Sequence, residues 1–149
     1  MKTFLSISIM LCSFSSHAAY IDVIGPCSKK PLHSGVFITD TDDSVGKISV
    51  DFFESKKIQY VGSNEGMAQI ANSPMGLDGM EVLSDTKMRA YGWCFSVNGV
   101  VPDVLPSKSY LGSQNDYISW FYAYSTYDQG VWLDYCVPSY QLKAEQFCK

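Results

Sequence analysis

Two segments with alternating bulky and small side chains dominate the hydrophobic pattern of the chain, residues 89–97 and residues 118–124. Successive side chains of an extended strand point to opposite faces, so each segment predicts a strand with one bulky, largely aromatic face. Asn98-Gly99 follows the first segment and favours a type I′ turn, because both residues of such a turn take positive φ. We therefore expect a strand, a tight turn and a short return through Val100-Val101. The residues expected on the bulky face are Tyr91, Trp93, Phe95 and Val97 from the first strand, and Ile118, Trp120, Tyr122 and Tyr124 from the second.

Short apolar runs between turn residues predict the other strands. Residues 20–24 and 35–39 are β-branched runs bounded by glycine and proline, and they predict the first two strands. Residues 58–79 hold three clusters of turn residues, which favours short extended pieces over a helix. Residues 131–133 predict one more short strand before a cysteine-containing tail. The connection of residues 102–116 is long, and such loops are often functional, so it is a candidate rim of a binding site.

One helix is predicted between the second strand and the winding segment. Ser44 and the acids before it offer N-cap side chains, and Val45, Ile48 and Phe52 follow at helical spacing before two lysines end the segment. The acids at the start and the lysines at the end suit the helix macrodipole. Because Ile48, Val50 and Phe52 also alternate, a strand is the rival interpretation.

The N-terminus has the pattern of a secretory signal peptide. A basic start is followed by a short apolar run over residues 4–14 and by small residues that suit cleavage after Ala18 or Ala19. We therefore exclude residues 1–19 from the fold and predict one exported domain, residues 20–149, in the periplasm or outside the cell.

Charge and length narrow the class of partner. The mature chain keeps 10 basic and 15 acidic residues, a net charge of −5. Nucleic acids and anionic membrane surfaces are bound through basic patches, so we expect neither as a partner. No second apolar run approaches the ~20 residues that a bilayer span requires, so we expect no membrane insertion of the mature chain.

Four cysteines remain after signal removal, and in an exported chain an even number predicts two disulfides. Zinc sites need closely paired cysteines, and the nearest pair here has eleven residues between its members, so we expect no metal site. Four cysteines allow three pairings, and the sequence does not decide among them. We favour Cys94 with Cys136 and Cys27 with Cys148, because a tail that crosses the small face of the sheet would meet Cys94 first.

These elements predict an α+β fold, a β-grasp-like mixed sheet with one crossover helix, stapled by two disulfides. The motif Tyr-Gly-Trp-Cys-Phe-Ser-Val-Asn-Gly at residues 91–99, with residues 112–116 and 118–122 after it, resembles the pattern W-x-F-x-V-N-G … G-D-x-I-x-W-x-Y. That pattern is typical of the secreted domain family related to the C-terminal domain of transcobalamin and intrinsic factor. The resemblance spans residues 35–132.

The resemblance implies a β-grasp domain which, in the cobalamin carriers, covers one side of the corrinoid held by a separate helical domain. This sequence holds no counterpart of that helical domain. The resemblance therefore implies the fold and binding at the sheet and its loops. Without the helical domain we expect no cobalamin, and we expect no other cofactor.

Few residues of the sequence suit catalysis. His33 is the single histidine of the mature chain and lies in a predicted turn, whereas hydrolytic triads need an oriented histidine. Asp42 and Asp43 suit helix capping better than acid–base work, and the spacing around them does not fit a calcium loop. We expect a non-catalytic binding or interaction module. The alternatives are a secreted inhibitor or effector that targets a partner protein and, less favoured, a hydrolase that uses acids alone.

The aromatic residues are the remaining candidates for function. Trp93, Phe95 and Trp120 are expected to pack under the helix, since large aromatic side chains dominate protein cores. Tyrosines near turns are candidates for binding instead, because the phenolic hydroxyl favours contact with water while the ring can stack on a flat ligand or a partner surface. The predicted ligand-binding residues, for an unknown small molecule or protein, are Tyr122, Tyr124, Tyr127 and Trp132.

Overall fold

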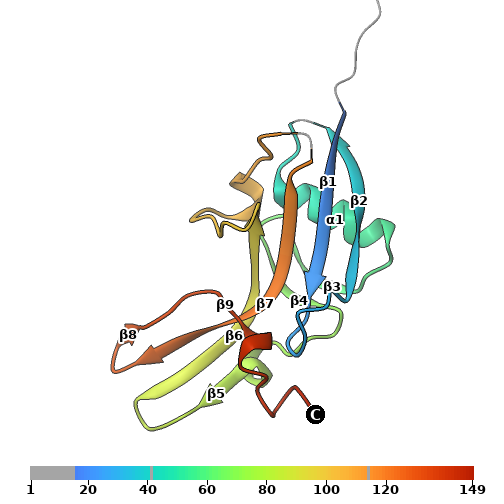
Figure 1. Cartoon of the computed structure of the whole chain (residues 1–149). Helices are drawn as coiled ribbons and strands as arrows, with labels where there is room; N and C mark the ends of the chain where they lie inside the picture. The colour runs from blue at the N-terminus through green and yellow to red at the C-terminus, as the bar shows by residue number, and fades with distance from the viewer. Residues whose placement is uncertain (1–15, 41, 114) are drawn as a thin grey trace, which may run out of the picture.

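The computed structural model describes residues 16–40, 42–113 and 115–149 (Figure 1). Residues 1–15, most of the predicted signal peptide, lie outside the described residues, whereas its last four residues belong to the first strand, β1 (Ser16–Ile24). This strand therefore begins before the predicted domain boundary at residue 20. None of the helices in the described part of the chain has the length and apolar character of a membrane span.

A mixed sheet with the path β2-β1-β7-β6-β5 forms the frame of the molecule. β1 lies inside the sheet, antiparallel to β2 and parallel to β7, while β7 is antiparallel to β6, β8 and β9. This arrangement, together with one α-helix and two disulfides, confirms the predicted fold class. The strands that join β1 are β2 (His33–Asp40), β5 (Met80–Val82), β6 (Lys87–Val97), β7 (Tyr117–Asp128), β8 (Val131–Trp132) and β9 (Val137–Pro138).

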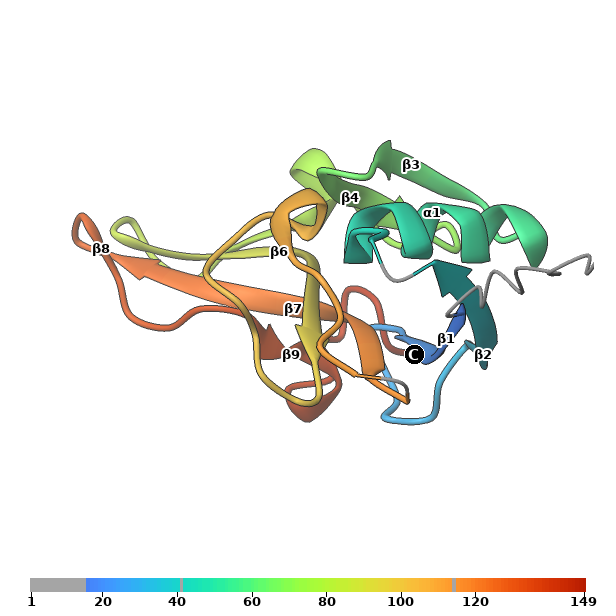
Figure 2. The same ribbon diagram turned by 90° about the horizontal axis from the view of Figure 1, so that it is seen from above.

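The helix α1 (Val45–Ser55) follows β2 and packs on one face of the sheet (Figure 2). Ser44 is its N-cap, and the Ser44 hydroxyl accepts a hydrogen bond from the Lys47 amide at 3.3 Å. Val45, Ile48 and Phe52 are fully buried, so the helical spacing is confirmed and the rival strand is wrong. The flanking acids and lysines stand outside the first and last turns of the helix, contrary to the macrodipole expectation.

The predicted winding segment forms a hairpin of β3 (Tyr60–Ser63) and β4 (Gly66–Ile70), a small sheet of its own on the α1 side (Figure 2). The hairpin packs against the backbone of the helix. A Cβ atom at Gly46 would stand 1.9 Å from the carbonyl oxygen of Asn64, so only glycine allows this approach. Three 3₁₀ turns complete the elements: η1 (Gly76–Gly79), η2 (Pro106–Lys108) and η3 (Ser139–Gln141).

The paired strands β6 and β7 carry the two faces that the alternation predicts, since Trp93 lies opposite Tyr122 and Phe95 opposite Trp120. The predicted turn is also present, with φ of 52° at Asn98 and 80° at Gly99. The predicted return is confirmed only for Val100, which makes a single antiparallel bridge with Val97. Val101 does not extend it into a strand.

Trp120 is the centre of the core beneath α1. It is almost fully buried, and its indole N–H donates to the Ser49 hydroxyl of the helix at 2.8 Å. Phe53 and Phe95 pack against the same indole, with ring centroids 6.3 and 5.4 Å away. Trp93 is half-buried, and its N–H donates to Ser73 at 2.7 Å. The predicted aromatic core is thus confirmed for Phe95 and Trp120.

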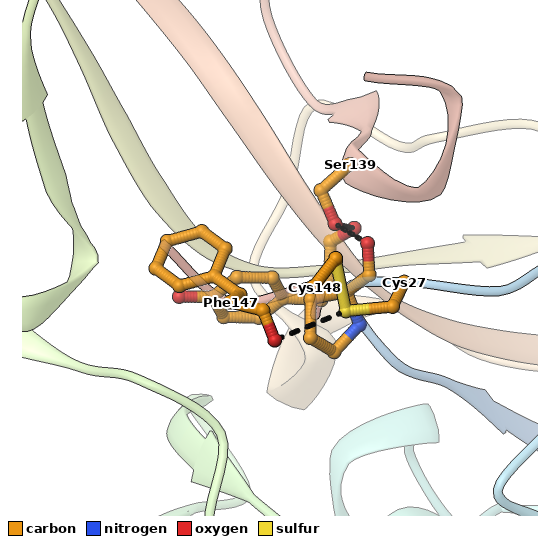
Figure 3. Close-up of a disulfide and its surroundings, with 6 residues drawn as sticks. Cys27, Ser139, Phe147 and Cys148 are labelled. Atoms are coloured by element: carbon orange, nitrogen blue, oxygen red, sulfur yellow. Dashed lines mark hydrogen bonds between the residues drawn. A yellow bond between two sulfur atoms is a disulfide. The ribbon is translucent and has the colours of Figure 1, made fainter. Parts of the chain in front are cut away.

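The C-terminal tail passes from one face of the sheet to the other. Cys136 binds Cys94 on the face opposite α1, β9 then pairs with the edge of β7, and Phe147 reaches the rings of Tyr91 and Tyr122 on the α1 side. There the Cys27–Cys148 disulfide holds the end of the tail (Figure 3). The favoured pairing of the four cysteines is confirmed.

Candidate functional site

The face of the main sheet opposite α1 is lined mainly by small and hydroxyl side chains. Phe121 is a large exception on β7, and it packs against Ala123 and the Cys94–Cys136 disulfide. We call this surface the open face, since α1 lies on the other side of the sheet (Figure 2). The β6 and β7 residues that point to it are Ala90, Gly92, Cys94, Ser96, Ser119, Phe121, Ala123 and Ser125.

Three hollows meet at Cys136, which lines all of them. The first, of about 270 Å³, lies over residues 90–94 of β6 and 123–125 of β7 and is called the distal groove. The second, of about 470 Å³, lies over the other end of the same strands, around Ser96 and Ser119, and is called the proximal groove. The third, of about 200 Å³, follows the edge of β6 and is called the edge hollow. Two of the hollows therefore lie on the open face, and the edge hollow extends from Cys136 around the edge of β6 toward the β3–β4 hairpin.

The distal groove has a flat floor and aromatic walls. Ala90, Gly92 and Ala123 line it from the sheet, while Trp132 and Tyr135 line it from the segment after β7. Trp132 is 54% exposed and Tyr135 is 75% exposed. A Cβ atom at Gly92 would meet no atom within 4 Å, so the space above this position is open. The groove can accept a flat apolar group between the two aromatic rings.

The edge hollow exposes backbone as well as side chains. β5 pairs with β6 only as far as Ala90, so the edge of β6 around Trp93 and Phe95 has no strand partner in the described residues. In the β6–β7 ladder the odd-numbered residues of β6 direct their backbone groups to this edge, as the Val97–Val100 hydrogen bonds show. The opposite wall is formed by Val101, by the start of the predicted rim loop (residues 102 and 104–106) and by residues 65–67.

The proximal groove combines hydroxyl groups with apolar surface. Ser96, Ser119 and Tyr117 line it beside Phe121 and Tyr140. The Tyr117 hydroxyl donates to the carboxylate of Asp22, a buried residue of β1. Burial, followed by this hydrogen bond, raises the pKa of Tyr117 to about 12. Tyr117 therefore stays protonated at neutral pH and keeps the wall of the groove uncharged.

The four predicted ligand-binding residues do not all point to one face of the sheet. Trp132 lines the distal groove, and its cross-strand partner Tyr127 packs edge-on against it, with ring centroids 5.2 Å apart. Tyr122 and Tyr124 occupy the alternate positions of β7, so their rings lie on the α1 side. Tyr124 still belongs to the lining of the distal groove together with Trp132, whereas Tyr122 lines none of the three hollows. A shared site for these residues stays a prediction.

Tyr122 is a core residue. It is fully buried, its hydroxyl donates to the carbonyl oxygen of Pro74 at 2.8 Å, and Phe147 packs on its ring. Burial raises the pKa of Tyr122 above its ordinary value. No face of this ring is open to a ligand.

Tyr124 is half-buried beneath a charged cluster. Its ring packs on Tyr91, and the Arg89 guanidinium lies 5.5 Å above its centroid. Arg89 in turn pairs with Glu81 at 3.0 Å, and Glu81 also accepts a hydrogen bond from the Tyr91 hydroxyl at 2.7 Å. These contacts hold the Tyr124 ring on the α1 side of the sheet.

The sequence reasoning missed Gly92 and Tyr135 as site residues. Gly92 could have been found because it is one of the small residues that alternate with the aromatic ones in β6, and a strand position without a side chain leaves space above the sheet. Tyr135 precedes Cys136, and the predicted Cys94–Cys136 disulfide was enough to place it beside the small face.

The residues considered for catalysis or metal binding lie in strands or at the entry to the helix. His33, expected in a turn, is instead the first residue of β2. Asp43 accepts a hydrogen bond from the Thr39 hydroxyl at 3.1 Å and pairs with Lys47 at 3.3 Å, so it stabilises the entry to α1. Across the described ranges, no three side chains among histidine, cysteine, aspartate and glutamate gather in a metal-binding arrangement.

Comparison with known proteins gives little further information. No protein-family model matches the chain, and no curated protein matches it. Among solved structures, the chain is similar to a candidate metal-binding protein from Ruminococcus gnavus, at 15% sequence identity and a TM-score of 0.40. The match covers 71% of this chain and 95% of that chain. Similarity at this level transfers neither a fold nor a ligand, and the transcobalamin-like motif stays a resemblance.

Proposed function

We propose that this protein is an exported, non-catalytic binding module that holds an extended, apolar segment of a partner protein across its open face. The observation that carries the proposal is the meeting of three separate hollows at Cys136, beside a strand edge with free backbone groups. Two of the hollows are smaller than the ~300 Å³ at which pockets for single drug-sized ligands begin. A row of small depressions suits successive side chains of one chain better than one enclosed molecule.

The lining of the three hollows supports a role without catalysis. Its charged side chains are Glu65 in the edge hollow and Lys29 in the proximal groove, so two acids do not converge in any one of them. Two disulfides support export, because disulfides persist in oxidising compartments.

Photo-cross-linking from the site tests the proposal. A benzoylphenylalanine in place of Tyr135 should cross-link to a protein in the native extracellular or periplasmic fluid, whereas the same residue in place of Tyr110 should not. Tyr110 is a suitable control because it is 57% exposed and lines none of the three hollows.

A second variant distinguishes the groove from its surroundings. Gly92→Leu should fill the distal groove without a clash and abolish the Tyr135 cross-link, while Gln59→Leu, on an exposed position outside the hollows, should leave it intact. Melting curves should be unchanged for both. Equal cross-linking from Tyr135 and Tyr110, or a cross-link that survives Gly92→Leu, would refute the proposal. If Tyr135 cross-links only to a small molecule, the ligand of the open face is that small molecule and the proposed protein partner is wrong.

A further inference from the structure

The outer edge of β2 carries a second row of free backbone groups, far from the open-face grooves. Backbone hydrogen bonds from Tyr20 to Asp116 and from Asn115 to Ala18, both 3.0 Å, show that even-numbered residues of β1 face β7. Odd-numbered residues of β1 therefore face β2. In the register that pairs Ala19 with Phe37, the odd-numbered residues of β2 face back toward β1.

Ser34, Val36 and Ile38 thus direct their N–H and C=O groups away from the sheet. In the part of the chain that the structure describes, no residue pairs with these groups. Natural sheets block such edges with proline, lysine, bulges or covering loops. The eight residues of β2 contain neither proline nor lysine, and the β1–β2 register runs without a shift.

The side chains beside this edge are apolar. Val36 is 63% exposed and Ile38 is 71% exposed, and both lie on the open face. Cross-strand pairs of β-branched residues stabilise a sheet, and these two side chains have no such partner on their outer side. The edge of β2 therefore offers both the backbone groups and the apolar side chains that one more strand needs for pairing.

We propose that this strand is β2 of a second copy, which pairs antiparallel about a two-fold axis and joins two sheets into one. The axis would place Val36 of each copy opposite Val36 or Ile38 of the other, with the side chains on the same face. A homodimer is favoured over a foreign strand because the edge is self-complementary in its apolar residues and its charges.

The charges along the edge have opposite signs at its two ends. Asp40, Asp43 and Asp51 surround Lys47 at one end, while Lys56 stands beside Gly35 at the other, next to the exposed Lys57. Antiparallel pairing brings the acidic end of each copy to the basic end of the other. A parallel arrangement would bring like charges together.

Sedimentation velocity on the oxidised protein over a range of concentrations tests the dimer. The molar mass should rise to twice that of the monomer, and Val36→Pro should weaken association by about tenfold or more, because each copy loses an edge donor. Proline should leave the β1 pairing intact, since the Val36 N–H faces outward. Ile38→Lys is a second blocking variant, and Val82→Lys is the control, because Val82 is a 77% exposed valine at the opposite edge of the sheet.

Amide hydrogen exchange identifies the interface residue by residue. In the dimer, the amides of Ser34 and Val36 should be protected as strongly as the Gly35 amide, which faces Ile21 of β1. In a monomer, only the Gly35 amide of these three should be protected. A protein that stays monomeric at every concentration, or a dimer that ignores both blocking variants, would overturn the proposal. So would unprotected even-numbered amides in a dimer. None of these outcomes affects the cross-linking test of the open face.

Discussion

Asp116 provides a direct test of how the loop before β7 is held. Its carboxylate accepts hydrogen bonds from the Gly112 and Ser113 amides at 2.7 and 3.0 Å, from the Ser113 hydroxyl at 2.6 Å and from the Asn98 side chain at 2.9 Å. Burial acts to raise the pKa of this group, but the hydrogen bonds from Ser113, Asn98 and Gly112 outweigh it and lower the pKa from 3.8 to about 2.

The lowered pKa sets both the size and the sign of the effect. A carboxyl with a lower pKa in the folded state stabilises the fold above its unfolded pKa, and this contribution is lost as the pH falls through the folded value. For Asp116 the contribution is about 2 kcal/mol, complete above pH ~5 and lost toward pH ~2. Asp116→Asn should therefore lower the free energy of unfolding at pH 7, and the difference from wild type should narrow by about 2 kcal/mol in acid.

Urea denaturation followed by tryptophan fluorescence, at pH 7 and again in acid, measures this difference. Asp103→Asn is the control, because Asp103 is exposed and its substitution should change stability by less than ~0.5 kcal/mol at either pH. If the deficit of Asp116→Asn is the same at both pH values, the ionised carboxylate does not stabilise the loop, and the reasoning fails.

Three further predictions concern the fold. Trp120→Ala should lower the free energy of unfolding by about 3–5 kcal/mol in urea denaturation, whereas Trp132→Ala should change it by less than ~0.5 kcal/mol, because the first side chain is buried and the second exposed. Gly99→Val should cost more than ~1 kcal/mol by the same assay, since φ is 80° there, and a neutral result would contradict the turn. Reduction of each disulfide should cost about 2–5 kcal/mol, visible as a lower melting temperature, and an unchanged melting curve after complete reduction would contradict it.

The strands and the turn of β6 could be predicted from sequence because their causes are local. Alternation assigns Trp93 and Trp120 to one face whatever lies beyond the strand, and Asn98-Gly99 favours positive φ by itself. The N-cap at Ser44 is equally local. The disulfide pairing followed from the same faces, since Cys94 lies on the small one.

The burial of Tyr122 could not be predicted in this way. The groups that cover it are the Pro74 carbonyl and the ring of Phe147, both distant in sequence and within segments that have no periodic pattern. The place of the Tyr124 ring on the α1 side was predictable, because the alternation assigns Tyr124 to the bulky face. The position of β2 at the edge of the sheet could not be predicted either, since it depends on the order of the strands and not on the residues of β2.

The Cys27–Cys148 disulfide gives the domain an unusual response to mechanical load. It joins residues 121 positions apart, and both cysteines of the second disulfide lie between them. Tension applied between the two ends would draw β1 from its place between β2 and β7 and then pass through the disulfide, so the chain between the two cysteines would carry none of it. The oxidised domain would lengthen only by residues outside the loop that the disulfide closes. In a reducing solution the same pull would extend the whole chain, so the redox state decides whether the domain behaves as a short tether or as a long one.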